Sequence, residues 1–273
     1  MSVPRMIMAE WRHWQRRGDG LPVGLMMVVG AMLYGWLLAV LLETTAVGGS
    51  LMDLTGLSRS GFHLAFRIER DMLLVLGFLM LQWGTATVAG EREAGTLRLL
   101  ALRAPRAVLP LGKAAFLGLV ATLLAFAVFL VALAVGAKTF GLTSVAAGPV
   151  EVVSLAELLG VGFWATILTL LPMASLLALS VAVSTLSRST AVAQVVTVGL
   201  VLGLAGLALV PGVGRISFLA TAAWPLTTAA ELGAGLRPFE AGDLLVPHLL
   251  VNLIWIVSCL TLAVLVCRRK DLA

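Results

Sequence analysis

The sequence predicts an all-α integral membrane protein in which six membrane-spanning helices form one domain. Hydrophobic residues make up 60% of the chain and charged residues only 12%, and the mean hydropathy is +1.05. These values exceed those of ordinary soluble domains. The 273 residues accommodate six apolar segments of about 20 residues, the length that crosses a bilayer. Too little chain remains for a nucleotide-binding domain, so we expect a membrane domain alone.

Residues 1–20 form a polar N-terminal segment, which we expect to be a separate interfacial helix. Met6, Trp11 and Trp14 recur there at near-helical spacing, opposite arginines and Glu10. This is the pattern of a basic amphipathic helix that lies in the headgroup region, where tryptophan anchors it. The glycines of the segment 18–20 should end this helix.

The remaining residues, 21–273, contain the six apolar segments. We predict spans at about 21–42, 72–89, 111–136, 155–184, 191–210 and 244–267. The segments 44–69 and 137–154 are too polar to cross and are predicted to be loops on one side, and residues 65–71 could form a short amphipathic lead-in to the second span. Residues 184–190 form a very short turn on the other side. Pro172 should kink the fourth span, because proline removes a hydrogen bond from the preceding turn.

The distribution of lysine and arginine predicts the orientation of the chain. If both termini are inside, the inner segments hold thirteen of these residues and the outer segments six. The inner set is Arg5, Arg12, Arg16, Arg17, Arg92, Arg98, Arg103, Arg106, Lys113, Arg188, Arg268, Arg269 and Lys270; the outer set is Arg59, Arg67, Arg70, Lys138, Arg215 and Arg237. Positive charge accumulates on the cytoplasmic side, so we expect a multi-pass protein with both termini in the cytoplasm.

The segment 90–113, GEREAGTLRLLALRAPRAVLPLGK, is the polar interruption with the densest set of charges. Gly95 permits a sharp change of direction, and Thr96 can cap a short helix. The leucines that follow supply apolar surface, while the arginines keep the segment in water, so the segment should lie along a membrane face. A plainer interpretation is that the charges only end one span and begin the next.

The order of residues in this segment resembles the cytoplasmic loop after the second span in permease subunits of type-2 ATP-binding-cassette (ABC-2) exporters. The resemblance lies in Glu-x-Glu-x-Gly-Thr-Leu, a leucine-rich turn, Arg-x-Pro-Arg and Leu-Gly-Lys. Arg98 stands where the family often has an acid or a neutral residue. In that family the loop carries a coupling helix that docks on a separate ATPase subunit. The residues implied to couple the chain to the ATPase are Glu91, Arg92, Glu93, Gly95, Thr96, Leu97, Arg98 and Arg103, with Ser187 and Arg188 in the internal turn.

The same resemblance implies the rest of the assembly. Two copies of an ATPase subunit, which use ATP and magnesium, would pair with two permeases, the second being another copy of this chain or a homologous one. The assembly would lie in the prokaryotic cytoplasmic membrane in contact with lipid, and accessory proteins could join it. The broken apolar segment 211–243 resembles the pair of short external re-entrant helices that precedes the last span in this family. The path outward would open between the second and fifth spans.

The sequence lacks the motifs of a self-sufficient enzyme. Gly112-Lys113 is followed by Ala114 and has no glycine five residues earlier, so the phosphate-binding loop of an ATPase is missing. The three histidines are scattered without ligand spacing, which argues against a metal site. No basic face interleaved with aromatics appears, so we expect no nucleic-acid partner. We therefore expect a non-enzymatic chain that binds no cofactor itself.

Polar side chains inside the predicted spans are candidates for a substrate path. They are Gln82, Trp83, Thr87, Gln194 and Asn252. Polar groups in lipid are costly unless they face a partner or a pathway, so these residues either line a path or only join helices. A different class of protein, an ion-coupled carrier, is suggested by a related set of polar residues within or beside spans: Gln82, Glu157, Gln194, His248 and Asn252. Against it, the acids Glu43 and Glu157 fall near span ends. A third possibility is a membrane anchor that transports nothing.

Overall fold

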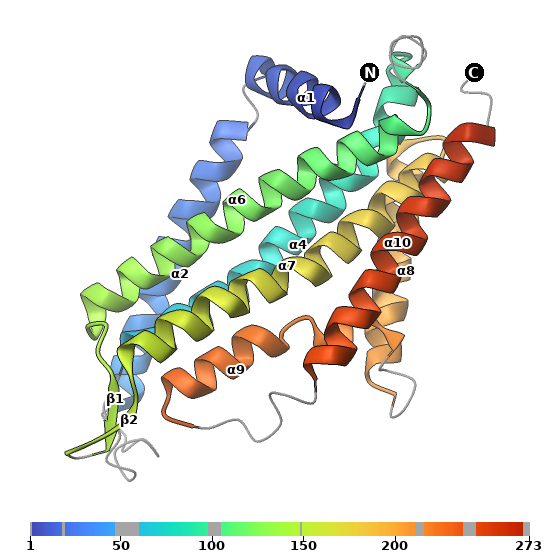
Figure 1. Cartoon of the computed structure of the whole chain (residues 1–273). Coiled ribbons are helices and arrows are strands. Elements are labelled where there is room, and N and C mark those ends of the chain that lie inside the picture. The colour runs from blue at the N-terminus through green and yellow to red at the C-terminus, as the bar shows by residue number, and fades with distance from the viewer. Residues whose placement is uncertain are drawn as a thin grey trace.

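The computed structural model describes residues 2–17, 20–46, 60–97, 105–147, 149–210, 216–236 and 244–269. These residues form an elongated bundle of long helices that run in broadly similar directions (Figure 1). In chain order the elements are α1 (Val3–Arg17), α2 (Gly20–Ala46), α4 (Gly61–Glu93), α6 (Val108–Thr139), β1 (Val145–Ala147), β2 (Val150–Val153), α7 (Leu155–Leu186), α8 (Thr190–Ala208), η2 (Phe218–Thr221), α9 (Trp224–Gly233) and α10 (Leu245–Arg269).

Five of the described helices are long and apolar enough to cross a bilayer: α4, α6, α7, α8 and α10. Their outward faces carry large apolar side chains such as Leu74, Phe78 and Leu202, which are 77%, 59% and 66% exposed. Surfaces of this kind are stable in lipid and not in water. The chain is therefore a multi-pass membrane protein. In α2, the apolar stretch with described side chains covers Leu25–Leu38, which is shorter than the other five.

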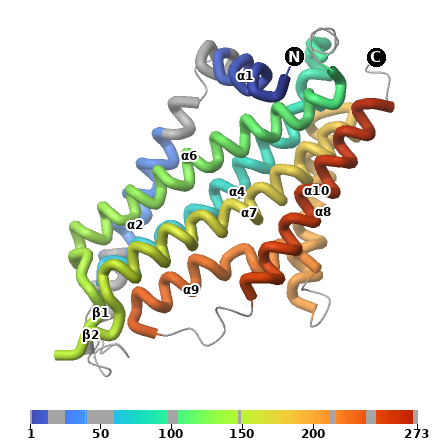
Figure 2. The backbone as a smooth tube through the Cα atoms, in the orientation of Figure 1, coloured from blue at the N-terminus to red at the C-terminus, as the bar shows by residue number. Residues whose placement is uncertain are grey.

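The two ends of the bundle differ in composition. One end, here called the α1 end, gathers α1, the C-terminal end of α4 and the C-terminal end of α10 (Figure 2). The opposite end, here called the hairpin end, carries the strands β1 and β2, and α9 lies toward it (Figure 1). The first and last described helices therefore have their outer ends at the same end of the bundle (Figure 2).

Helix α4 is the central element, and it begins earlier than predicted. It packs against α2, α6, α7, α8 and α9. Its first residue is Gly61 and its N-cap is Ser60, whose hydroxyl accepts from Phe62 N at 3.3 Å and donates to Thr143 O at 2.9 Å. The prediction of a loop over 44–69 was therefore wrong for residues 44–46, which belong to α2, and for residues 61–64, which belong to α4. The helix over 65–69 agrees with the predicted lead-in, and residues 47–59 lie outside the described part of the chain.

Polar residues in the first turns of α4 find partners inside the bundle. His63 bonds Ala230 O of α9. Arg70 Nε donates to Asp71 at 3.1 Å, and Tyr34 of α2 donates to the same carboxylate at 2.5 Å. The same part of α4 buries Phe62 and Phe66 in the main apolar cluster between α4, α6, α7 and α9. A polar composition therefore does not exclude a membrane helix when its polar groups have partners inside the bundle.

The prediction of an all-α protein is nearly correct, but it omits a small antiparallel hairpin. In the predicted loop 137–154, β1 and β2 pair with Val145 opposite Val153 and Ala147 opposite Val150. Val145 and Val153 are buried against the main apolar cluster. This β-branched pair covers the end of the bundle, where helices leave apolar side chains without a neighbour.

The other predicted spans agree closely with the helices. The third, fourth, fifth and sixth fall on α6, α7, α8 and α10, and the first falls on α2. The internal turn is shorter than predicted, because α7 continues to Leu186 and α8 begins at Thr190 after the N-cap Ser189. Two short helical segments, η2 and α9, stand where re-entrant helices were expected.

Helix α1 confirms the predicted N-terminal helix, but its apolar face contacts protein. Met6 is 1% exposed and lies against Gly112 of α6, where an added Cβ would approach Met6 Cγ to 2.5 Å. The ring of Trp11 meets Phe116 of α6 edge to face at 6.4 Å between centroids. These contacts pack α1 against α6.

Candidate functional site

The C-terminal turn of α4 ends the helix sharply. Gly95 has φ = 69°, a left-handed conformation that residues with a Cβ rarely adopt. Gly95 N donates to Arg92 O at 3.1 Å, and Thr96 N donates to Glu91 O at 3.0 Å, which together make a Schellman motif. Leu97 is 2% exposed and packs on Val88 of α4. The chain is therefore folded back onto α4, as the glycine predicted.

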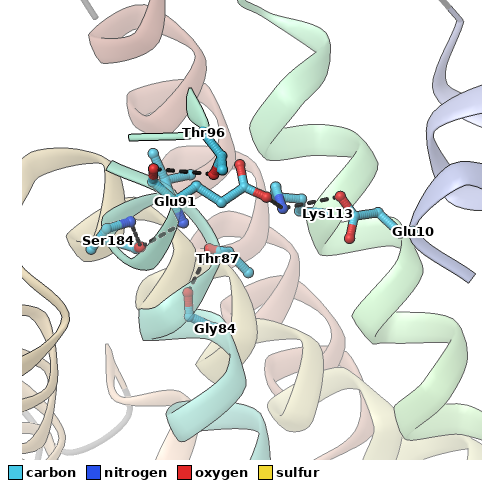
Figure 3. A network of polar contacts seen from close by, with 9 residues as sticks. Glu10, Gly84, Thr87, Glu91, Thr96, Lys113 and Ser184 are labelled. Carbon is cyan, nitrogen blue, oxygen red and sulfur yellow. Dashed lines mark hydrogen bonds and ion pairs between the residues drawn. The ribbon is translucent and has the colours of Figure 1, made fainter. Parts of the chain in front are cut away.

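A buried lysine lies between two acids next to this turn (Figure 3). Lys113 Nζ of α6 donates to Glu91 Oε1 of α4 at 2.5 Å and to Glu10 Oε1 of α1 at 3.0 Å. The lysine side chain is only 7% exposed, and those of Glu10 and Glu91 are 17% and 23% exposed. A buried cation needs such partners, since the desolvation of an isolated charge is costly. The group ties α1, α4 and α6 together and carries two carboxylates for one ammonium.

The two residues after Glu91 contact the adjoining ends of α7 and α8. Arg92 donates to Ser187 O and, at 3.4 Å, to Thr185 O, among the last carbonyls of α7. Glu93 Oε2 accepts from Thr190 Oγ1 at 2.7 Å, at the first residue of α8. A cation at a helix C-terminus and an anion at a helix N-terminus both complement the helix dipoles. Three consecutive residues of α4 thus hold α6, α7 and α8 in turn.

Ser184 of α7 joins the backbone of α4 just before this turn (Figure 3). Its hydroxyl donates to Thr85 O at 2.7 Å and accepts from Val88 N at 3.0 Å and Ala89 N at 2.9 Å. The side chain is fully buried. A hydroxyl inserted into a helix ladder in this way fixes the register of two helices against each other. We call the group formed by Glu10, Glu91, Arg92, Glu93, Lys113 and Ser184 the α1-end network.

The predicted coupling residues divide into three groups. Glu91, Arg92 and Ser187 bond within the chain, and Ser187 is 8% exposed with its hydroxyl donating to Val183 O at 2.8 Å. Glu93, Gly95, Thr96 and Arg188 are exposed, whereas Leu97 is buried. Arg98 and Arg103 lie outside the described residues, as does the coupling helix predicted after Thr96. The second group is therefore the most accessible to an outer partner, while Glu91 and Arg92 are partly exposed.

The residues predicted to line a path bond to neighbouring backbone or to each other. Gln194 Nε2 of α8 donates to Gln82 Oε1 of α4 at 2.5 Å. Thr87 Oγ1 donates to Gly84 O at 2.6 Å, and Trp83 packs between the two largest apolar clusters. Asn252 is fully buried and accepts from Ser175 Oγ at 2.8 Å. The Gln82 and Asn252 bonds join helices, as the plainer interpretation expects, and a role in a path stays a prediction.

Sequence reasoning missed Glu10, Lys113 and Ser184 as partners of this loop. A signal existed for Lys113, since a charge at the start of an apolar run needs a counter-charge. Which acid provides it depends on how α1 packs, which the linear sequence does not show. No signal distinguished Ser184 from Ser180, because both are small polar residues in one apolar run.

A further buried acid lies nearer the hairpin end. Glu69 of α4 is 1% exposed, and its Oε1 accepts from Thr166 Oγ1 of α7 at 2.7 Å. Among the described residues its second oxygen, Oε2, has no hydrogen-bond partner. The sequence prediction placed Glu69 at the end of a loop or in an amphipathic lead-in to the second span, and neither interpretation buried it inside the bundle.

The described residues contain no cluster of three or more histidine, cysteine or acidic side chains that could hold a metal ion. His63 instead bonds Ala230 O through Nδ1 at 2.9 Å, and both cysteines are unoxidised and buried in α10. Neither a scan of protein-family models nor a search of curated proteins returns a match to the chain. The function proposed below therefore rests on the geometry of the bundle and on the sequence pattern.

Proposed function

We propose that this chain is the permease subunit of an ATP-driven exporter of the ABC-2 type, and that the exposed turn after α4 receives force from a separate ATPase subunit. The observation that carries the proposal is the set of bonds made by Glu91, Arg92 and Glu93. A helix end that only led into a linking loop would need no bonds to other helices, whereas these last three residues of α4 contact α6 and the adjoining ends of α7 and α8. In this proposal α2 is the sixth crossing helix.

The α1-end network supplies a route by which a push on the turn spreads through the bundle. Movement of Gly95 and Thr96 displaces the end of α4, and α6 follows through Lys113 while α7 follows through Arg92. The Schellman turn keeps the exposed residues in a fixed relation to α4, so that force is not lost in a flexible loop. An ATPase subunit shifts the permease between two states only by contacting them differently.

The proposed docking surface is formed by Glu93, Thr96 and Arg188, which are exposed at the α1 end. It is of mixed charge, so a partner with alternating charges fits it better than a uniformly acidic or basic one. A second copy of the permease completes the proposed path between the two subunits. Both termini are proposed to lie on the ATPase side, in the cytoplasm.

A cross-linking experiment tests the docking surface. Thr96→Cys and Arg188→Cys, each in a chain whose two native cysteines are alanine, should cross-link to the ATPase in the purified assembly. Val150→Cys, 63% exposed at the hairpin end, is the control and should not. Absence of an ATPase from an assembly that still transports, or cross-links from Val150 alone, contradicts the proposal.

A functional test uses an exposed charge, because replacing Glu91 also breaks its bond to Lys113. Arg188→Glu should lower ATP-driven export severalfold while the chain keeps its thermal stability, since Arg188 is on the surface. The matched control is Glu151→Lys in β2, an exposed charge reversal at the opposite end. Equal export by both variants would count against docking at the α1 end.

Glu69 favours a second candidate function, an ion-coupled carrier. Such carriers place an acid within the membrane, and acids there are rare and usually functional. Glu69 meets this criterion by its burial and by the unpartnered oxygen Oε2, whereas the acids considered from the sequence alone lie near helix ends. This candidate needs no ATPase.

The two candidates predict different behaviour of the purified chain. In vesicles with an entrapped pH dye and an imposed potassium gradient, an ion-coupled carrier moves protons or exchanges them for a cation, and Glu69→Gln abolishes the signal. Thr166→Val, which removes only the hydroxyl donor, should weaken it less. If the chain alone gives no ion flux and its assembly with an ATPase transports upon ATP addition, the second candidate is excluded.

A further inference from the structure

A proline inside α7 leaves one backbone carbonyl without its helical donor. Pro172 lies in the middle of α7 and is buried. Proline has no N–H, so the carbonyl four residues earlier, that of Leu168, loses its helical partner. In a membrane bundle a carbonyl left without a donor is costly, because lipid supplies none.

His248 of α10 supplies the missing donor. Its Nε2 lies 3.0 Å from Leu168 O, and since a carbonyl only accepts, Nε2 carries the hydrogen of this bond. The other ring nitrogen, Nδ1, lies 3.0 Å from Thr221 Oγ1 of η2, whose hydroxyl can donate to it. The histidine is fully buried, and its ring lies 5.6 Å from that of Trp224 at the start of α9.

One turn further along α10, Asn252 holds the other side of the proline. Ser175 Oγ lies 2.8 Å from Asn252 Oδ1 and 3.1 Å from Leu171 O. Asn252 Nδ2 in turn donates to the backbone oxygen of His248 at 2.8 Å. Two consecutive turns of α10 therefore contact α7 immediately before and after Pro172.

We propose that His248 is a positioning residue that sets the bend of α7 at Pro172 and couples it to the short segments η2 and α9. The same helix α7 ends in the α1-end network, where Ser184 and the carbonyls of Thr185 and Ser187 contact α4. Helix α7 thus connects the network to the segments near the hairpin end. A change in the position of η2 alters the donor for Leu168 O and with it the angle between the two halves of α7.

The proposal rests on the proposed transport function only for its consequence, the opening of a path at the hairpin end. The bend itself is measurable in the full-length chain without an ATPase. The positioning role of His248 and the exporter proposal can therefore fail independently of each other.

A mutant cycle between positions 172 and 248 tests the assignment. Pro172→Ala restores the N–H that Leu168 O lacks, so the carbonyl no longer requires the histidine. We expect His248→Ala to raise the unfolding equilibrium constant about tenfold in the chain that keeps Pro172, the loss expected for one buried carbonyl left unsatisfied. In the Pro172→Ala chain the same change should raise it less than about threefold. His248→Gln, which keeps an N–H donor, should recover most of the loss.

The control is Cys259→Ala, also buried in α10 but about 16 Å further along the helix at 1.5 Å per residue. Its effect should be the same with proline or alanine at position 172, because distant sites are additive. An equal effect of His248→Ala in both chains would overturn the proposal, since the histidine would then stabilise the bundle without serving the proline.

A distance measurement separates positioning from general stability. Spin labels at Ala156→Cys and Leu186→Cys, both exposed near the ends of α7, are placed in a chain whose native cysteines are alanine. His248→Ala should broaden the distance distribution between the labels. Pro172→Ala should narrow it around a straight-helix value of about 45 Å between the labelled backbone positions, with or without His248. An unchanged distribution in His248→Ala refutes the positioning role.

Discussion

Ser184→Ala offers the sharpest test of the link between α7 and α4. The change removes one hydroxyl and leaves the Cβ, so packing is unaltered while three bonds to α4 are lost, those with Thr85 O, Val88 N and Ala89 N. Hydrogen bonds within membrane bundles average about 0.6 kcal/mol each. The three together predict a loss of about 2 kcal/mol, or roughly a thirtyfold rise in the unfolding equilibrium constant.

Ser180→Ala is a matched control, one turn away on the same helix. Ser180 is equally buried, but its hydroxyl donates only to Leu176 O of its own helix, at 2.8 Å. That carbonyl belongs to the helix ladder and keeps a partner without the serine. The expected loss is therefore below about 0.6 kcal/mol.

The assay is reversible unfolding of the purified chain in mixed micelles of increasing denaturing detergent, followed by far-ultraviolet circular dichroism. The free energy of unfolding of each variant is compared with that of the parent chain under identical conditions. If Ser184→Ala and Ser180→Ala cost the same within error, then the bonds from Ser184 to α4 contribute nothing beyond an ordinary buried serine. Ser184 would then not fix α7 against α4.

Two further predictions concern packing and charge. Lys113→Met removes the ammonium that Glu10 and Glu91 share and should destabilise the chain by about 2–4 kcal/mol. The losses from Lys113→Met and Glu91→Gln should be less than additive in the double variant, and strictly additive losses would contradict the pairing. Gly84→Ala should cost about 1–3 kcal/mol, because the new Cβ would lie 2.6 Å from Ser180 Cβ. Gly199→Ala, where a Cβ meets nothing within 4 Å, should be neutral or stabilising by up to about 1 kcal/mol; detergent unfolding measures all of them.

The periodicity and length of the apolar runs were sufficient to locate the helices. The fourth, fifth and sixth predicted spans agree with α7, α8 and α10 to within about two residues, because a bilayer requires continuous apolar helix and polar groups end it abruptly. The prediction failed at residues 61–64, which were expected to be a loop. There His63 bonds Ala230 O of α9 and Phe62 is buried, and composition alone does not register contacts between helices.

The candidate site was located by the sequence but not described by it. The charges around Gly95 and the glycine itself were visible in the linear order, and the left-handed turn follows directly from them. The partners were not visible, because Lys113 lies 22 residues from Glu91 and 103 from Glu10. Only the packing of α1 and α6 beside α4 brings these charges together.

The sequence by itself determined that the chain is a helical membrane protein, where its helices lie and where the chain reverses direction. These properties depend on local hydropathy and backbone freedom, which act over one or two helical turns. Tertiary structure alone decided that Ser184 rather than Ser180 joins α4, that Glu69 is buried, and that His248 serves the carbonyl freed by Pro172. Those contacts depend on the rotation of one helix about its axis relative to its neighbours, and that angle is set by the packing of the whole bundle.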